Sequence, residues 1–267
     1  MEMYWRRLGM VLGVTLLGHA ALAQMPDPQH PALPQGYLAP GALDAVRIVP
    51  PAPKEGDARA IMDRHMFRAT RKLQGSERWA LATADVALMP ADLMKDFSCA
   101  AGVELTPQSA PHLAALMGRV GADGFIVNEA AKRSFKRLRP FQIQPGPICQ
   151  PEAQLADSFD YPSGHTVWGW SWALVLAELV PDRATDILAR GRAYGESRAV
   201  CGAHNASAVD AGLVVAASTF ATLHGSAEFR TDMDAARAEV SAQRAQGPPA
   251  EPTSCAREAK IVAQPPY

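Results

Sequence analysis

Three short segments of the chain carry residues whose types and spacing could perform chemistry. The first segment, KRSFKRLRPF, occupies residues 132–141 and has five basic residues within eight positions. Lys132 and Arg139 are seven residues apart, close to two helical turns, so we expect them on one face of one helix. Pro140 then ends that helix, because the residue before a proline avoids the α conformation. On its own, such a basic run is most often a solvated helix face.

The second segment, YPSGHTVWGW, occupies residues 161–170. Pro162 precedes an apolar stretch that we expect to be a buried helix. The amides of Ser163, Gly164 and His165 would then cluster at the positive end of the helix dipole, which is a ready site for an anion. His165 would stand where it could donate a proton to a group leaving that anion.

The third segment, SRAVCGAHNASAVD, occupies residues 197–210 and contains Arg198 and His204. A lone histidine in such a segment is more often structural than nucleophilic. Together, however, the three segments supply two arginines, a lysine, a helix N-terminus and two histidines. Arginine forks suit the tetrahedral oxygens of phosphate, and lysine adds a point charge. The sequence therefore predicts a phosphate site with a nucleophile and an acid on opposite sides.

The order of these motifs resembles the signature of the type 2 phosphatidic acid phosphatase (PAP2) superfamily. Within it, the chain is most similar to the soluble, secreted class A bacterial non-specific acid phosphatases. The resemblance covers most of residues 60–225. It rests on K-x6-R-P, P-S-G-H and S-R-x5-H, which fall on Lys132, Arg139, Pro140, Pro162, Ser163, Gly164, His165, Ser197, Arg198 and His204.

The resemblance implies an all-α, single-domain helical bundle of the PAP2/vanadium haloperoxidase type. It also implies hydrolysis of small phosphate monoesters through a phosphohistidine, with no metal and no cofactor. By position, His204 would attack phosphorus and His165 would protonate the leaving alkoxide. The residues that would hold the phosphoryl oxygens are Lys132, Arg139, Ser163, Gly164 and Arg198. Soluble relatives of this kind are often homodimers, so we expect a homodimer here.

The chain departs from the family pattern after the proposed nucleophile. The pattern places an aspartate four residues beyond the histidine, where it orients the imidazole, but this chain has Ala208. Asp210 lies about 120° further round a helix and could not replace it there. Asn205, a backbone carbonyl or a distant acid could still orient His204.

Three functions stay open on the sequence alone. The first is a phosphatase, either slowed by Ala208 or relying on another orienting group. The second is a phosphate-binding protein with lost or weak turnover. The third is a different use of the pocket, through vanadate-dependent haloperoxidase-like oxidation or phosphotransfer. The sequence does not define a pocket for the leaving group.

The N-terminus has the pattern of a signal peptide. Arg6 and Arg7 precede the apolar run LGMVLGVTLLGHAALA, and Ala21-Leu22-Ala23 forms a cleavage site. We therefore expect residues 1–23 to be removed and the protein to be periplasmic. The run is too short and too poorly flanked for a stable membrane span.

Four cysteines remain after that cleavage. In an oxidising compartment an even number predicts two disulfides, and three pairings are possible. Because the cysteines are scattered singly, a metal site is the less favoured interpretation. The four residues are Cys99, Cys149, Cys201 and Cys255.

Composition favours one helical domain without a nucleic-acid partner. The chain has 267 residues, 48% of them hydrophobic, which is enough for one sizeable core. The net charge of −1 gives no indication of binding to nucleic acid or an anionic membrane. We expect a Pro-rich extended arm over residues 24–56, the helical domain over 57–245 and a Pro-rich, loosely held tail over 246–267. The expected helices lie near residues 57–73, 76–89, 108–120, 123–137, 164–180, 182–196, 205–225 and 231–244.

Overall fold

Every regular element in the computed structural model, which describes residues 33–247 and 252–267, is helical. The all-α fold expected from the sequence is therefore confirmed. The expected signal peptide, residues 1–23, and the first part of the expected arm lie outside the described residues.

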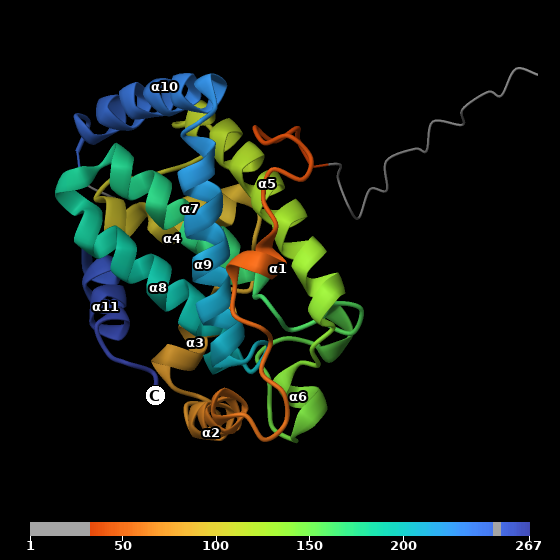
Figure 1. The fold of residues 1–267 in the computed structure, drawn as a ribbon. Coiled ribbons are helices and arrows are strands. Elements are labelled where there is room, and N and C mark those ends of the chain that lie inside the picture. The colour runs from red at the N-terminus through yellow and green to blue at the C-terminus, as the bar shows by residue number, and fades with distance from the viewer. Residues whose placement is uncertain (1–32, 248–251) are drawn as a thin grey trace, which may run out of the picture. The chain divides into compact units, whose positions relative to one another are not determined.

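The helices cover most of the described chain (Figure 1). They are α1 (Ala45–Ile48), α2 (Ala58–Arg71), α3 (Glu77–Ala84), α4 (Pro90–Ala101), α5 (Pro111–Phe135), α6 (Pro140–Ile143), α7 (Gly164–Leu179), α8 (Ala184–Cys201), α9 (Ala206–Leu223), α10 (Ala227–Arg244) and α11 (Pro252–Val262). Short 3₁₀ turns cover Glu152–Gln154 and Pro181–Arg183.

Helix α5 is one continuous helix where the sequence predicted two. Gly121 lies between the two expected ranges, 108–120 and 123–137, yet its backbone is helical and faces the ring of Trp168 on α7. A Cβ at this position would come within 2.1 Å of that ring. The glycine therefore permits close packing of α5 on α7 and does not interrupt the helix. Helices α4 and α11 were not expected either, and α11 begins within the Pro-rich tail.

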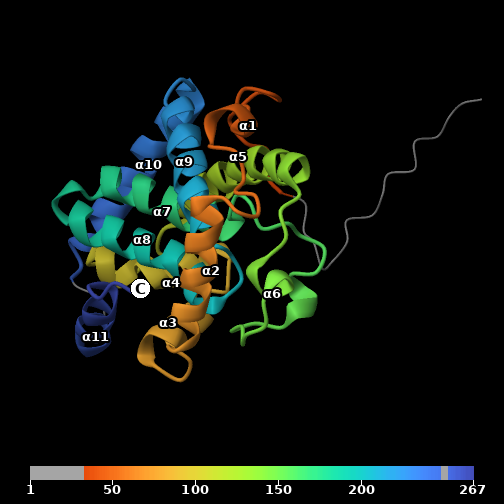
Figure 2. The same ribbon diagram turned by 60° about the horizontal axis from the view of Figure 1, so that its bottom comes forward.

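Helix α7 is the centre of the packing and contacts α8, α9 and α5. It is apolar nearly all round, and Trp172, Val175 and Leu176 are fully buried in the main core. Figures 1 and 2 show α9 beside α7, with α5 on one side and α8 on the other. Because a helix buried on several sides needs an apolar surface all round, the composition of α7 follows from its place.

Helix α9 lies within the helix expected near residues 205–225. It has 18 residues with a mean hydropathy of 1.5, so by length and composition alone it could cross a membrane. Half of that stretch is buried, and the helix packs against α7, α5 and α8. A position in the protein core accounts for this composition.

The described part of the N-terminal arm lies along α5. The amides of Tyr37 and Leu38 donate to the carboxylate of Asp123, at 2.7 and 3.2 Å. The short helix α1 buries Ala45 and, just after its end, Val49 packs in the same apolar cluster. The arm thus follows the surface of its own chain over these residues.

The end of α8 brings two predicted site residues together. Gly202 has φ +79°, a left-handed conformation that turns the chain out of the helix. The amides of Ala203 and His204 then both bond to the carbonyl oxygen of Arg198, at 3.0 and 3.2 Å. Arg71 on α2 donates to the carbonyl oxygen of Ala199 in the same turn. This helix end fixes the distance between Arg198 and His204.

Two disulfides settle the pairing that the sequence left open. Cys149 and Cys201 join the loop after α6 to the end of α8. Cys99 and Cys255 join α4 to α11 across 156 residues of sequence. The second bridge explains why the tail carries an ordered helix despite its proline content.

We expect the Cys99→Ser/Cys255→Ser variant to unfold more easily than the parent protein. Closing so long a loop restricts the unfolded chain, and its loss lowers the free energy of unfolding by about 3–5 kcal/mol. Urea unfolding followed by circular dichroism measures this difference. An unchanged midpoint would mean that the bridge between Cys99 and Cys255 contributes nothing to the stability of the domain.

Candidate active site

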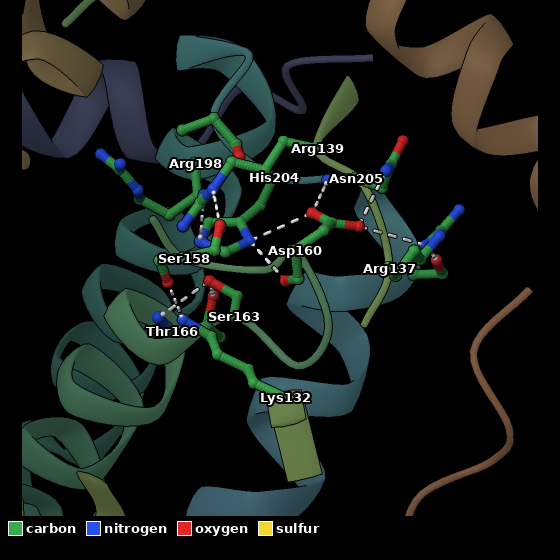
Figure 3. A network of polar contacts seen from close by, with 12 residues as sticks. Lys132, Arg137, Arg139, Ser158, Asp160, Ser163, Thr166, Arg198, His204 and Asn205 are labelled. Carbon is green, nitrogen blue, oxygen red and sulfur yellow. Dashed lines mark hydrogen bonds and ion pairs between the residues drawn. The ribbon is translucent and has the colours of Figure 1, made fainter. Parts of the chain in front are cut away.

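His204 is buried between the end of α8 and the start of α9, with 3% of its surface exposed. Its Nδ1 atom lies 2.7 Å from the carbonyl oxygen of Asp160 and 3.1 Å from Oδ1 of the same residue (Figure 3). A carbonyl oxygen only accepts hydrogen bonds, so Nδ1 carries the hydrogen. The lone pair of the neutral ring is therefore on Nε2.

Asp160 itself is completely buried and surrounded by donors. Its Oδ1 accepts the amide of Asn205 at 3.0 Å, and its Oδ2 accepts Nδ2 of Asn205 at 2.8 Å. Arg137 lies 3.3 Å from Oδ2. Burial raises the pKa of the Asp160 carboxyl, whereas Arg137 and Asn205 lower it. Because every one of these neighbours donates, the ionised carboxylate is the form that this site satisfies.

Asp160 answers the question raised by Ala208. It immediately precedes the YPSGH motif and lies 44 residues before His204, so no short motif linked the two. Ala208 is fully buried, and its carbonyl oxygen accepts the amide of Ser163 at 2.9 Å. Asp210 is exposed, in keeping with its expected place round the helix. Both a backbone carbonyl and a distant acid thus contact the ring.

A second carboxylate supports the same helix end. Asp63 on α2 accepts the amide and the hydroxyl of Ser207, at 2.9 and 2.6 Å. Arg137 donates to Asp63 at 2.7 Å and also to the hydroxyl of Ser207. Asp63 and Asp160 therefore flank the N-terminus of α9, where the helix dipole favours negative charge. Sequence analysis missed both acids and Arg137.

Arg139 is not on the same helix as Lys132, so that prediction was wrong. Helix α5 ends at Phe135, and Lys136 has φ +49°, which turns the chain away. Arg139 instead precedes Pro140, the first residue of α6. Its side chain donates to the carbonyl oxygens of Ser158 and Ala203, at 2.7 and 2.8 Å.

Those two carbonyl contacts direct Arg139 at the proposed nucleophile. Its Nη1 lies 3.1 Å from Nε2 of His204. Burial, together with Arg139, Lys132 and Arg198, lowers the pKa of His204 well below the usual 6.5. The ring is therefore neutral, and the unprotonated Nε2 faces a cation.

Lys132 reaches the same place from the last turn of α5. Its ammonium group is buried, 2.9 Å from the hydroxyl of Ser158 and 3.2 Å from Glu129. Gly164 at the start of α7 is close by, since a Cβ there would lie 3.8 Å from the Lys132 nitrogen. The backbone at the start of α7 and the lysine thus approach one another across a small space.

Arg198 has unused donors. It is fully buried, and Nη2 donates to the side-chain oxygen of Gln150. Its Nε and Nη1 have no hydrogen-bond partner among the described residues. Burial lowers the pKa of this guanidinium to about 10, so it stays charged at neutral and acid pH. Because unpaired buried donors on a cation are costly, an anion would fit here.

The start of α7 departs from expectation at one amide. Ser163 caps the helix, and its hydroxyl accepts the amide and the hydroxyl of Thr166, at 3.3 and 2.9 Å. The amide of Ser163 donates to the carbonyl oxygen of Ala208. It is therefore not available to bind an anion, contrary to the prediction. The amides of Gly164 and His165 begin the helix and have no acceptor within it.

His165 is held by one backbone group. Its Nε2 lies 3.1 Å from the carbonyl oxygen of Val86, beyond the end of α3. Burial lowers the pKa of His165 well below 6.5, and the nearby Arg198, His204 and Lys132 add to this effect. A bound phosphate would oppose these cations and raise the pKa again.

The structure thus brings the predicted residues to one place, where α5, α7, α8 and α9 meet. They are Lys132, Arg139, Ser163, Gly164, His165, Arg198 and His204 (Figure 3 shows all of these except Gly164 and His165). The group presents three cations, two amides and two histidines, which suits a phosphoryl group. Over residues 33–247 and 252–267, no cluster of three or more His, Cys, Asp or Glu could hold a metal ion.

Comparison with known proteins gives a consistent result. The pattern of the PAP2 superfamily matches residues 113–232. An acid phosphatase of Zymomonas mobilis is 45% identical over 75% of this chain and 77% of its own length. A non-specific acid phosphatase of Providencia stuartii is 36% identical, over 74% and 81%. The corresponding enzyme of Salmonella typhimurium is 33% identical, over 72% and 78%.

We expect Arg198→Met to weaken binding of inorganic phosphate by about 10- to 100-fold, because charge-assisted hydrogen bonds are each worth about 1.5–3 kcal/mol. Isothermal titration calorimetry measures the change. The matched control is Arg192→Met on the same helix, where the side chain is 41% exposed and pairs with Glu196. Equal affinity in the Arg198 variant and the control would show that the unused donors do not bind the anion.

Proposed function

Because the chain belongs to the PAP2 superfamily, as one of its acid phosphatases, we propose that it hydrolyses phosphate monoesters through a phosphohistidine on His204. One observation carries this proposal. Nδ1 of His204 is 2.7 Å from the Asp160 carbonyl oxygen, which leaves the lone pair on Nε2. An unprotonated, oriented nitrogen among cations is what attack on phosphorus requires.

In the first step, Nε2 of His204 attacks phosphorus and the bond from phosphorus to the ester oxygen breaks. Protonated His165 donates its proton to that oxygen, and the alcohol leaves. The ring of His204 gains positive charge as the N–P bond forms. The Asp160 carboxylate, 3.1 Å from Nδ1, stabilises this charge.

In the second step, neutral His165 accepts a proton from water as the water oxygen attacks phosphorus. The N–P bond breaks, and phosphate leaves with His204 restored to its neutral form. In both steps Lys132, Arg139 and Arg198 would stabilise the negative charge on the phosphoryl oxygens. Since three cations and two helix amides supply this charge, we propose that no metal is needed.

The other functions left open by the sequence lack a specific supporting observation. A binding protein without turnover would follow from an unoriented histidine, but Asp160 orients the ring. Phosphotransfer differs only in the acceptor of the second step, an alcohol in place of water. Haloperoxidase-like use of vanadate finds no additional support in the described residues.

We also propose that the protein is periplasmic. The two disulfides fit an oxidising compartment, and the predicted signal peptide would direct export. The homodimer implied by the resemblance remains a prediction.

The phosphohistidine is tested by acid-labile labelling. The purified mature protein is mixed with a ³²P-labelled phosphomonoester in excess chelator and then quenched. We expect base-stable, acid-labile label on His204 together with steady release of phosphate. The His204→Ala variant, which keeps the cations, is the control and should bind phosphate without being labelled.

Three results would contradict parts of this proposal. Full turnover in His204→Ala would exclude this residue as the nucleophile. Turnover that requires a divalent ion would exclude the metal-free reaction. Tight phosphate binding with neither label nor turnover in the parent protein would indicate a binding protein.

The role of Asp160 gives a second prediction. Asp160→Ala should lower kcat by about 10- to 100-fold, less than the roughly 10⁴-fold loss in serine proteases, because the backbone carbonyl of residue 160 remains. Ala208→Asp should not raise kcat, since Nδ1 already has its acceptors. Steady-state kinetics with p-nitrophenyl phosphate measures both variants.

The exposed Asp210, two residues beyond position 208, provides the control as Asp210→Ala, which should leave kcat unchanged. A higher kcat in Ala208→Asp would mean that Asp160 orients His204 poorly. An unchanged kcat in Asp160→Ala would mean that its carboxylate takes no part.

A further inference from the structure

The segment from Asp85 to Ala87 follows α3 and lies against the proposed general acid. Its central carbonyl oxygen, that of Val86, is 3.1 Å from Nε2 of His165. Because this oxygen can only accept, Nε2 of His165 keeps its hydrogen. The nitrogen that gains and loses a proton is then Nδ1. The Val86 carbonyl thus decides which nitrogen of His165 can act as the acid.

Side chains of α8 hold the residues on both sides of Val86. The buried carboxylate of Asp85 lies 2.5 Å from the hydroxyl of Ser197 and 2.6 Å from Arg190. The hydroxyl of Tyr194 donates to the carbonyl oxygen of Ala87 at 2.8 Å. All three donors come from one helix face, so α8 sets the position of the whole segment.

The hydrogen of the Ser197 hydroxyl is directed at Asp85. Arg78 donates to Ser197 Oγ at 2.9 Å and to the carbonyl oxygen of Ala193 at 3.0 Å. Oγ also lies 2.9 Å from the carbonyl oxygen of Ala193, but its contact with the Asp85 carboxylate is shorter and charge-assisted, so the hydroxyl donates to Asp85. Ser197 belongs to the S-R motif, yet its hydroxyl contacts Arg78, this segment and its own helix, and no hydrogen bond joins it to the phosphate site among the described residues.

We propose that Asp85, Ser197 and Tyr194 are positioning residues that hold the Val86 carbonyl and thereby orient His165 for protonation of the leaving group. This inference rests on the proposed function, in which His165 is the acid. Adjacent residues of the S-R motif would then serve the two halves of one reaction: Arg198 binds the phosphoryl group, and Ser197 acts through Asp85 on the acid.

A purely structural role would lower activity equally for all substrates. Loss of acid catalysis lowers activity unequally, because a strongly acidic alcohol can leave the ester as its anion without first receiving a proton. The experiment therefore compares kcat/KM for glycerol 2-phosphate, whose alkoxide needs protonation, and 2,4-dinitrophenyl phosphate, whose phenoxide does not. The quantity kcat/KM reports the first step, in which the leaving group departs.

We expect Ser197→Ala and Tyr194→Phe each to lower kcat/KM about tenfold or more for the glycerol ester and less than about threefold for the dinitrophenyl ester. His165→Ala should show the same selectivity with a larger loss. Tyr194→Phe keeps the ring that packs against Phe97 and leaves the buried ion pair of Asp85 with Arg190 intact, so it provides a second test if Ser197→Ala does not fold. The control is Ser98→Ala, a buried serine whose hydroxyl binds the carbonyl oxygen of Met94.

The outcomes separate the two proposals. Equal losses for both esters in Ser197→Ala and Tyr194→Phe, with selectivity retained in His165→Ala, would overturn the positioning role alone. Equal losses in His165→Ala would overturn its role as the acid, and the positioning role with it. Selective losses in Ser98→Ala would also overturn the inference, because they would arise from any buried serine.

Discussion

The hydrogen bonds from Nδ1 of His204 to Asp160 are the interaction on which the rest of the site depends. They place the ring hydrogen on one nitrogen and the lone pair on the other. Asp160 can do this because Asn205 and Arg137 satisfy its remaining lone pairs at the positive end of α9. The ring, the loop before α7 and the first turn of α9 are therefore one connected unit.

Around this unit the protein gathers more positive charge than it neutralises. Lys132 has Glu129 as a partner, and Arg139 is satisfied by carbonyl oxygens, so both are held in place without a bound anion. Arg198 differs, because it keeps two buried donors without a partner among the described residues. The interaction of such preorganised charges with a phosphoryl group becomes stronger as water is excluded. The charges need no rearrangement when negative charge develops on that group.

The sequence predicted the fold class and the gathering of three motifs at one phosphate site, because each motif is local and its residue types suit phosphate. It could not predict Asp160 or Asp63, since these acids reach α9 through tertiary contacts over 44 and 144 residues. The prediction of a single helix for Lys132 and Arg139 was wrong because the chain turns at Lys136. Its backbone is left-handed, a conformation that a lysine side chain does not favour. The sequence predicted two helices where α5 is continuous, because the role of Gly121 depends on its contact with the ring of Trp168.

The acceptor nearest to Nδ1 of His204 is the main-chain oxygen of residue 160, which is present whichever amino acid occupies that position. A sequence without an aspartate at position 208, as here, therefore keeps this acceptor. It also keeps the tautomer of His204, and the side chain at position 160 affects only the stabilisation of charge. Patterns that demand an aspartate four residues after the histidine would reject such sequences, although their histidine is still oriented.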